Sequence, residues 1–339
     1  MQKIDFLAIG DLVIDAFIKL RDAHVHCKID TNACELCVRF GDKVPFESVE
    51  VVPAVGNSPN ASVAAARLGL KSALLASVGD DQNGRDCLES LKKDKVNTKF
   101  IRIEKGKPTN YHYVLWYEAE RTILIKHTEF NYHLPKDLPE PAWIYLSSLA
   151  SNALPFQIEI EEYLKEHPNI KLAFQPGTFQ IEQGYDRLKN LYKRAEVFFC
   201  NKEESQRILN TKENDIKILL QKIRELGPKI AVITDGPAGA YAYTEGSEYN
   251  RGNGKEAWYT PMYPDPAPPV DRTGAGDAFS STFTIALAYG KMIPEALSWG
   301  PINSMSVVQY VGAQKGLLSR EKLEEYLKNA PENYMIKSI

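Results

Sequence analysis

The chain alternates between short apolar runs and helix-forming segments from about residue 140 onward. Four runs have the length and composition of buried strands: residues 143–146, 171–174, 197–200 and 230–234. Helices are expected between them, beginning near Pro155, Gly184 and Glu203. Strands that alternate with helices at this spacing predict an α/β fold, in which a central, mostly parallel sheet is flanked by helices on both faces.

The rest of the chain divides into body-like and β-rich segments. A strand is expected over 4–9 and another over 72–78, and helices are expected over 60–68, 84–95, 274–289, 294–311 and near 320–328. Residues 16–54 and 100–130 instead alternate as β structure does. We therefore predict an α/β body of residues 1–15, 55–99 and 131–339, with a small β-sheet lid inserted in two pieces. Such a lid keeps water away from reactive phosphates.

Composition excludes several classes of protein. The 339 residues are 44% hydrophobic and 25% charged, an ordinary globular mixture. Lys and Arg number 41 against 44 Asp and Glu, so a general nucleic-acid binder is disfavoured. No run approaches the roughly 20 apolar residues of a membrane helix, and no signal peptide is expected. Five cysteines do not suggest a disulfide framework, so we expect no membrane association and a cytoplasmic location.

The segment 270–279 carries the most specific chemical signal. Gly274, Ala275 and Gly276 precede an amphipathic helix, and small residues there let backbone N–H groups approach an anion closely. Asp277 lies at the start of this helix, where a carboxylate would take a proton from an attacking hydroxyl. The alternative is a glycine-rich turn in which Asp277 caps the helix.

Two further clusters follow predicted strands at the edge of the sheet where ligands bind. After strand 197–200, Asn201 and Glu204 are candidates for orienting hydrated Mg²⁺, or for capping the next helix. After strand 230–234, Thr234, Gly236 and Gly239 form either a loop near nucleotide phosphates or an ordinary hairpin turn. There is no Gly-x-x-x-x-Gly-Lys-Ser/Thr motif, so a P-loop kinase is excluded.

Candidate acceptor-binding residues lie nearer the amino terminus. Gly56, Asn57 and Asn60 open an alanine-rich helix and are candidates for holding sugar hydroxyls, or for a helix cap. Asp15 follows the first strand and is suited to accept hydrogen bonds from two hydroxyls. Arg121 follows a predicted lid turn, where it would either meet an acceptor phosphate or carboxylate or be solvated.

Taken together, these motifs resemble the ribokinase/PfkB family of carbohydrate kinases over nearly the full chain. Residues 271–279, Asp-Arg-Thr-Gly-Ala-Gly-Asp-Ala-Phe, look like the family's carboxyl-terminal signature, and 56–69 looks like its amino-terminal signature. Asn201 and Glu204 match its Asn-x-x-Glu motif. The resemblance implies a Rossmann-like ribokinase fold with a lid, Asp277 as base, and an anion hole from Gly274, Ala275 and Gly276. It also implies the remaining roles: Asn201 and Glu204 for Mg²⁺ and phosphates; Thr234, Gly236 and Gly239 for the nucleotide; Asp15, Gly56, Asn57 and Asn60 for the acceptor.

The resemblance further implies the cofactors and partners. These are ATP and Mg²⁺, a sugar or sugar-derivative substrate, and a homodimer formed through the lid. A monovalent cation such as K⁺ is implied behind the anion hole, near Asp271, Thr273, Gly312 and Gly316. Two alternatives stay open: a nucleoside kinase of the same family, favoured by the aromatic residues in 111–117, and a catalytically silent sugar-binding protein on the same fold.

The first lid piece also holds a group of possible metal ligands. They are His24, His26, Cys27, Cys34 and Cys37, and Cys34-x-x-Cys37 has the short spacing of a zinc half-site. A zinc site, a redox-sensitive cysteine pair and ordinary lid cysteines are the three alternatives.

Overall fold

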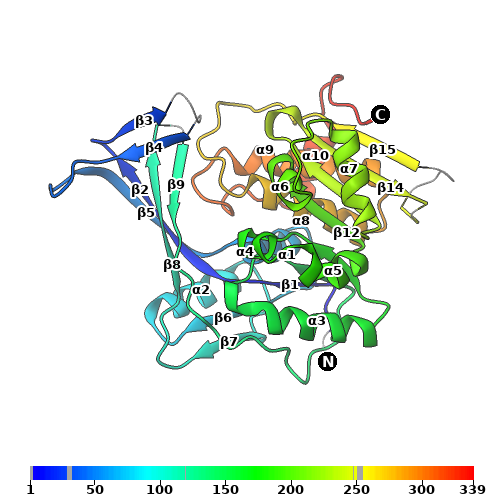
Figure 1. Ribbon diagram of the computed structural model, residues 1–339, viewed down its shortest axis with the longest axis horizontal. Helices are drawn as coiled ribbons and strands as arrows, with labels where there is room; N and C mark the ends of the chain where they lie inside the picture. Colours follow the sequence, from blue (N-terminus) through cyan, green and yellow to red (C-terminus); the bar gives the residue numbers. More distant parts are fainter. Residues whose placement is uncertain (1–2, 29–32, 119, 247, 250–254) are drawn as a thin grey trace.

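A ten-stranded sheet forms the centre of the computed structural model, which describes residues 3–28, 33–118, 120–246, 248–249 and 255–339 (Figure 1). Its strands follow the order β16 (Lys337–Ser338), β15 (Lys255–Thr260), β14 (Ala240–Glu245), β13 (Ile230–Thr234), β12 (Val197–Asn201), β11 (Lys171–Phe174), β10 (Trp143–Leu146), β1 (Phe6–Ile9), β6 (Ser72–Gly79) and β7 (Ile101–Glu104). Neighbours from β13 to β7 pair in parallel, whereas β14, β15 and β16 are antiparallel. The predicted mostly parallel sheet is confirmed.

Helices cover both faces of this sheet, as the alternating pattern predicted. On one face lie α1 (Asn57–Arg67), α2 (Gln82–Lys93), α8 (Ala275–Ala288), α9 (Ile293–Val307) and α10 (Arg320–Lys328). On the other lie α3 (Leu154–Glu166), α5 (Tyr185–Arg194), α6 (Lys202–Ile208) and α7 (Ile216–Glu225), with α4 (Thr178–Gln183) beside α5. Within the described ranges, no helix is long and apolar enough to cross a membrane.

Side chains alternate between two hydrophobic cores because successive residues of a strand point to opposite faces. Phe6 and Ala8 of β1 enter the core under α1 and α8, while Leu7 and Ile9 enter the core under α3 and α5. All four are fully buried. A strand that is buried on both faces is an unbroken run of hydrophobic residues. The central strands could therefore be recognised in the sequence.

A separate four-stranded sheet projects from one side of the body (Figure 1). Its order is β5 (Phe46–Val55), β2 (Val13–Leu20), β8 (Asn110–Tyr117) and β9 (Glu120–Leu124). The central pair β2 and β8 is parallel, and both edge strands are antiparallel to their neighbours. We call this sheet the lid. The small second sheet was predicted, but β7, at the start of the second predicted piece, pairs with β6 in the large sheet.

A two-stranded hairpin, β3 (His24–Lys28) and β4 (Ala33–Cys37), extends beyond the lid. Cys27 and Cys34 face each other in its register and form a disulfide, a single bridge that the sequence analysis did not predict. The bridge removes two of the five candidate zinc ligands, Cys27 and Cys34. Within the described part of the chain, no group of three or more His, Cys, Asp or Glu side chains is arranged to hold a metal ion.

Candidate active site

The carboxyl ends of neighbouring parallel strands meet the amino terminus of α8 at one cavity of about 260 Å³. Gln175 follows β11, while Asn201 and Thr234 end β12 and β13 and are paired in register. The other polar side chains in the lining are Asn57, Glu204, Asp277 and Ser280. Because side chains at the carboxyl edge of a parallel sheet converge, residues from separate predicted clusters share one space.

Three amide groups hold the carboxylate of Asp277, which is 9% exposed. Asn57 Nδ2 and Gln175 Nε2 donate to Oδ1 at 2.7 Å and 3.2 Å, and Asn60 Nδ2 donates to Oδ2 at 2.8 Å. Burial raises the pKa of Asp277 above its usual value, while these amide donors oppose the rise and the nearby Asp15 adds to it. The carboxylate is therefore fixed in orientation and is a stronger base than an exposed aspartate.

The sequence analysis assigned Asn57 and Asn60 to the acceptor, but in the structure both amides reach the predicted base. Gly56, just before α1, has φ +116°, and a Cβ there would lie 2.9 Å from the carbonyl oxygen of Asp11. A side chain at this position would therefore be strained and crowded. The glycine allows α1 to begin close to β1, so that its first turn faces Asp277.

Gln175 is a site residue that sequence reasoning missed. The buried hydroxyl of Tyr145 donates to Gln175 Oε1, which leaves Nε2 directed at Asp277. The sequence position of Gln175 could have identified it. Gln175 directly follows β11, and Asn201 lies at the same carboxyl edge of the sheet, at the end of β12.

Two glycines at the start of α8 serve different purposes. Gly274 has φ +80°, and a Cβ there would lie 2.2 Å from the Cβ of Ala313. At Gly276 a Cβ would meet nothing within 4 Å, and the residue lines the cavity beside Asp277. No side chain caps the amino terminus of this 14-residue helix. Its partial positive charge and backbone N–H groups are therefore available to an anion at the cavity.

A second, more apolar cavity of about 460 Å³ lies beside the first. Thr234 and Gly276 line both cavities, so a chain of phosphates would pass between them. The other lining residues include the predicted glycines and a group of apolar side chains: Gly236, Gly239, Met262, Phe279, Pro301, Met305 and Val308. Mostly apolar walls with few polar groups suit the base and ribose of a nucleotide.

Asn201 and Glu204 cap α6 reciprocally, which is one of the alternatives that the sequence left open. Asn201 Oδ1 accepts from the Glu204 N–H at 2.7 Å, and Glu204 Oε2 accepts from the Asn201 N–H at 2.8 Å. Both side chains also line the smaller cavity. Burial raises the pKa of the Glu204 carboxyl, and Asp277 contributes to the rise. The capping role and a role at the cavity are thus compatible.

Asp15 lies opposite His112 where β2 pairs with β8. His112 Nδ1 lies 3.4 Å from Asp15 Oδ1, and both side chains are 11% exposed. Asp15 Oδ1 and His112 Nε2 are buried without a hydrogen-bond partner in the structure. Buried polar atoms are nearly always paired, so these two atoms need partners from water or from a ligand.

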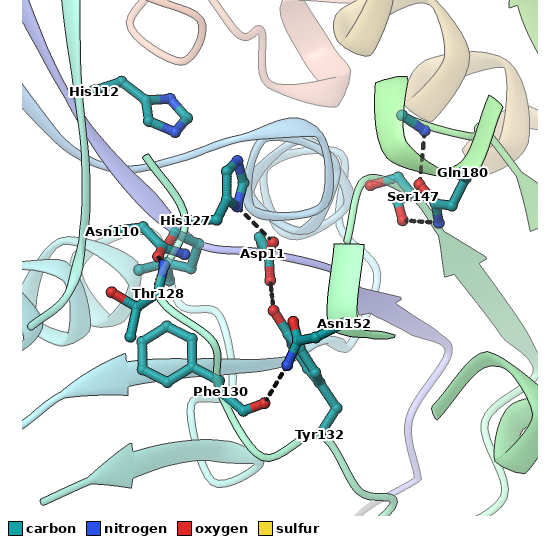
Figure 2. Close-up of polar contacts among 12 residues, drawn as sticks. Asp11, Asn110, His112, His127, Thr128, Phe130, Tyr132, Ser147, Asn152 and Gln180 are labelled. Atoms are coloured by element: carbon teal, nitrogen blue, oxygen red, sulfur yellow. Dashed lines mark hydrogen bonds and ion pairs between the residues drawn. The ribbon is translucent and has the colours of Figure 1, made fainter. Parts of the chain in front are cut away.

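A second imidazole lies next to the first. His127 Nδ1 is 2.8 Å from Asp11 Oδ2, and the Tyr132 hydroxyl donates to Asp11 Oδ1 at 2.7 Å (Figure 2). The rings of His112 and His127 have their centres 5.2 Å apart. Asp11 and both histidines were not predicted as site residues. The contacts of Asp11 join residues 116 and 121 positions apart, so no local sequence pattern reveals them.

Arg121 lies away from this cluster. Its Nε is 3.3 Å from Asp271 Oδ1, and its Nη2 donates to the carbonyl oxygen of Val270 at 3.0 Å. The sequence analysis placed Arg121 at the acceptor or in solvent, whereas its guanidinium contacts the loop before α8.

Comparisons with known proteins show the family and the fold of this chain. A family model described as pfkB family carbohydrate kinase matches residues 26–320. The 5-dehydro-2-deoxygluconokinase 1 of Bacillus cereus is 26% identical over 298 residues, which cover 82% of this chain and 87% of that protein. The ATP-dependent 6-phosphofructokinase of Thermoanaerobacterium thermosaccharolyticum is 25% identical over 341 residues, with 92% and 90% covered. The structure of Arabidopsis thaliana ribokinase complexed with ribose and ATP has a TM-score of 0.75 at 18% identity and covers 96% of this chain and 99% of that one.

Proposed function

We propose that this chain, which belongs to the pfkB family of carbohydrate kinases, transfers the γ-phosphoryl group of ATP to a primary hydroxyl of a sugar or sugar derivative. The observation that carries the proposal is the position of Asp277. Its carboxylate is buried, held by three amides and placed at the amino terminus of α8, beside the cavity that continues into the apolar one.

In the proposed reaction, Asp277 takes the proton of the acceptor hydroxyl as the hydroxyl oxygen attacks the γ-phosphorus. The bond from that phosphorus to the β,γ-bridging oxygen breaks, and ADP leaves. Backbone N–H groups of residues 274–276 and the partial positive charge of α8 stabilise the charge on the transferring group. Asp277 ends the step protonated and returns its proton to solvent when the products leave.

Mg²⁺ is the metal that fits the residues at the smaller cavity. Glu204 supplies a carboxylate and Asn201 an amide oxygen, the oxygen donors that Mg²⁺ prefers. When bound, Mg²⁺ neutralises developing charge on the phosphates. Both residues keep their capping contacts with α6, so we propose that Glu204 acts mainly through its buried negative charge and through water molecules.

Replacing Glu204 with glutamine is expected to raise the Mg²⁺ concentration needed for half-maximal activity by about tenfold, because outer ligand partners contribute at that scale. Glutamine keeps the size of the side chain and can still accept from the Asn201 N–H. A Mg²⁺ titration at fixed ATP measures the effect. Glu203→Gln, which alters an exposed carboxylate on the same turn of α6, is the matched control. An unchanged titration in Glu204→Gln would refute the assignment.

For the acceptor, we propose binding by Asp15 and His112, with Gly56, Asn57 and Asn60 lining its approach to Asp277. Asp15 Oδ1 accepts no hydrogen bond and has only the long contact with His112 Nδ1, at 3.4 Å, so it is placed to accept from a hydroxyl of the acceptor. The nucleoside alternative relied on aromatic stacking, but the Trp116 ring is already contacted by Arg121 and by Lys19, at 4.2 Å and 5.5 Å from its centre. These contacts remove one of the four aromatic rings in 111–117 that could stack on a nucleoside base.

A panel of acceptors tests the proposed function. ADP release from Mg-ATP would be measured with 5-dehydro-2-deoxygluconate, ribose, fructose, fructose 6-phosphate, other sugar acids and nucleosides. Turnover that depends on one sugar class supports the proposal and names the acceptor. Turnover of nucleosides alone would replace it with the nucleoside kinase. Acceptor binding without ADP release would favour the silent sugar-binding protein.

We also propose a homodimer through the lid, whose two edge strands expose apolar side chains. Val49 and Val51 of β5 are 53% and 51% exposed, and Ile123 and Leu124 of β9 are 44% and 52% exposed. Sedimentation should give the mass of a dimer for the wild type and of a monomer for the double variant Val49→Lys, Val51→Lys. Ile158→Lys, on α3, is the control and should stay dimeric. A monomeric wild type, or a dimeric double variant, would contradict the proposal.

A further inference from the structure

Arg121 joins the lid to the loop that leads into the anion hole. It lies on β9 opposite Trp116 of β8, and its guanidinium stacks 4.2 Å from the centre of that ring. Its side chain is 10% exposed and that of Asp271 is 0% exposed. Among the lysine and arginine ion pairs found in the described residues, it is the one that links a lid strand to the body.

Asp271 holds two body loops together. Its Oδ1 accepts from the backbone N–H and the hydroxyl of Thr273, at 2.9 Å and 2.8 Å. Its Oδ2 accepts from the N–H of Gly312 at 2.9 Å. The carboxylate therefore ties the segment just before Gly274 to the loop that follows α9. Arg121 contacts the same Oδ1 and the neighbouring carbonyl of Val270, so it acts on the segment that positions the anion hole.

The monovalent cation that the family resemblance implies was expected at this place. Its candidate ligands are Asp271, Thr273, Gly312 and Gly316, mostly through backbone carbonyls, and both oxygens of the Asp271 carboxylate already accept hydrogen bonds. The Gly316 carbonyl accepts from the Ser306 hydroxyl at 2.7 Å. A K⁺ ion here would also lie beside a guanidinium in a buried site, where like charges repel strongly. Asp271 therefore already has a cationic partner in Arg121.

We propose that Arg121 takes the place of the monovalent cation. Its guanidinium neutralises the buried Asp271, holds the loop before Gly274, and makes the anion hole depend on the position of the lid rather than on K⁺. Arg121 is thus a positioning residue, and the part of the proposal that concerns turnover rests on the proposed kinase reaction.

Thermal unfolding tests the proposal without requiring any activity. The melting temperature would be measured in KCl and in tetramethylammonium chloride at equal ionic strength, because the organic cation is too large for the space that a shortened side chain leaves. We expect the wild type and Lys19→Ala, which removes a lid lysine paired within the lid, to melt equally in both salts. Arg121→Ala should melt at a lower temperature in tetramethylammonium and recover in KCl. Arg121→Lys keeps the charge and should not respond to KCl.

Turnover provides a second readout once an acceptor is known. The wild-type kcat should be the same in both salts, whereas Arg121→Ala should lose about 100-fold in tetramethylammonium and regain activity in KCl, because the anion hole loses its support. Wild-type stability or turnover that requires K⁺ would overturn the proposal, as would an Arg121→Ala protein that behaves like wild type. If no acceptor is phosphorylated, the kinase reaction fails, while the unfolding comparison still decides the role of Arg121.

Discussion

Asp277→Asn is expected to lower kcat by about 10³-fold, because a positioned general base contributes on the order of 10² to 10⁴ in rate. Asparagine has the same shape but cannot take the proton of the acceptor hydroxyl. It also presents an NH₂ group to the surrounding amides of Asn57, Asn60 and Gln175, so some of the hydrogen bonds that orient the side chain are lost. ATP binding should be nearly unchanged, because the nucleotide cavity lies on the other side of Gly276. Initial rates at saturating substrates, with calorimetric titration of ATP, measure the two effects.

The pH dependence of kcat/KM provides a second test of Asp277 as the base. Burial raises the pKa of Asp277 above its usual 3.8, and only the ionised carboxylate accepts a proton. Wild-type kcat/KM should therefore fall as the pH drops through that raised pKa, at a higher pH than an exposed aspartate would give, and the residual rate of Asp277→Asn should lack this acidic limb. Asp186→Asn, at an exposed carboxylate on α5, is the control. A kcat of Asp277→Asn within about tenfold of wild type would show that another group is the base.

Gly276→Val is expected to weaken ATP binding by about 10- to 100-fold while leaving the fold intact, since forcing extra atoms into occupied space costs about 1–3 kcal/mol. A Cβ at Gly276 meets no protein atom within 4 Å, and Gly276 lines both cavities. The valine side chain would therefore project into the cavity space. Isothermal titration with ATP and a thermal melt measure binding and stability separately.

A substitution at Gly274 is the control for Gly276→Val, because it should affect stability. Gly274→Ala places a Cβ 2.2 Å from that of Ala313 at a backbone φ of +80°, so it should lower the melting temperature. If Gly276→Val also unfolded the protein, or bound ATP as well as wild type does, then Gly276 would not mark the path of the phosphates.

The parts of this molecule that the sequence predicted are those with local signals. The central strands are short apolar runs, and the start of α8 is marked by Gly274, Ala275 and Gly276 within three residues. The packing of Asn57 and Asn60 against Asp277 joins residues 220 and 217 positions apart, so no spacing in the sequence reveals it. The motifs singled out all three residues as candidates, but they did not show that two of them contact the third.

The lid was harder to predict in detail for a related reason. Residues 101–104 alternate like the lid strands, yet β7 completes the edge of the large sheet, because pairing depends on which neighbour is available rather than on the strand's own pattern. The partners of His112, His127 and Arg121 likewise follow from how the lid docks on the body. Only the structure brings Asp15, Asp11 and Asp271 to these side chains. The exact bounds of body and lid remain a prediction.

The central claim, phosphoryl transfer from ATP to a primary hydroxyl, is tested most directly by ³¹P NMR of the product formed from Mg-ATP and the acceptor selected by the panel. We expect ADP and an equal amount of a phosphomonoester whose phosphorus signal is split by the two protons of a CH₂–O group, with almost none of either formed by Asp277→Asn in the same time. Inorganic phosphate as the only new phosphorus species, or an ester on a secondary carbon, would contradict it.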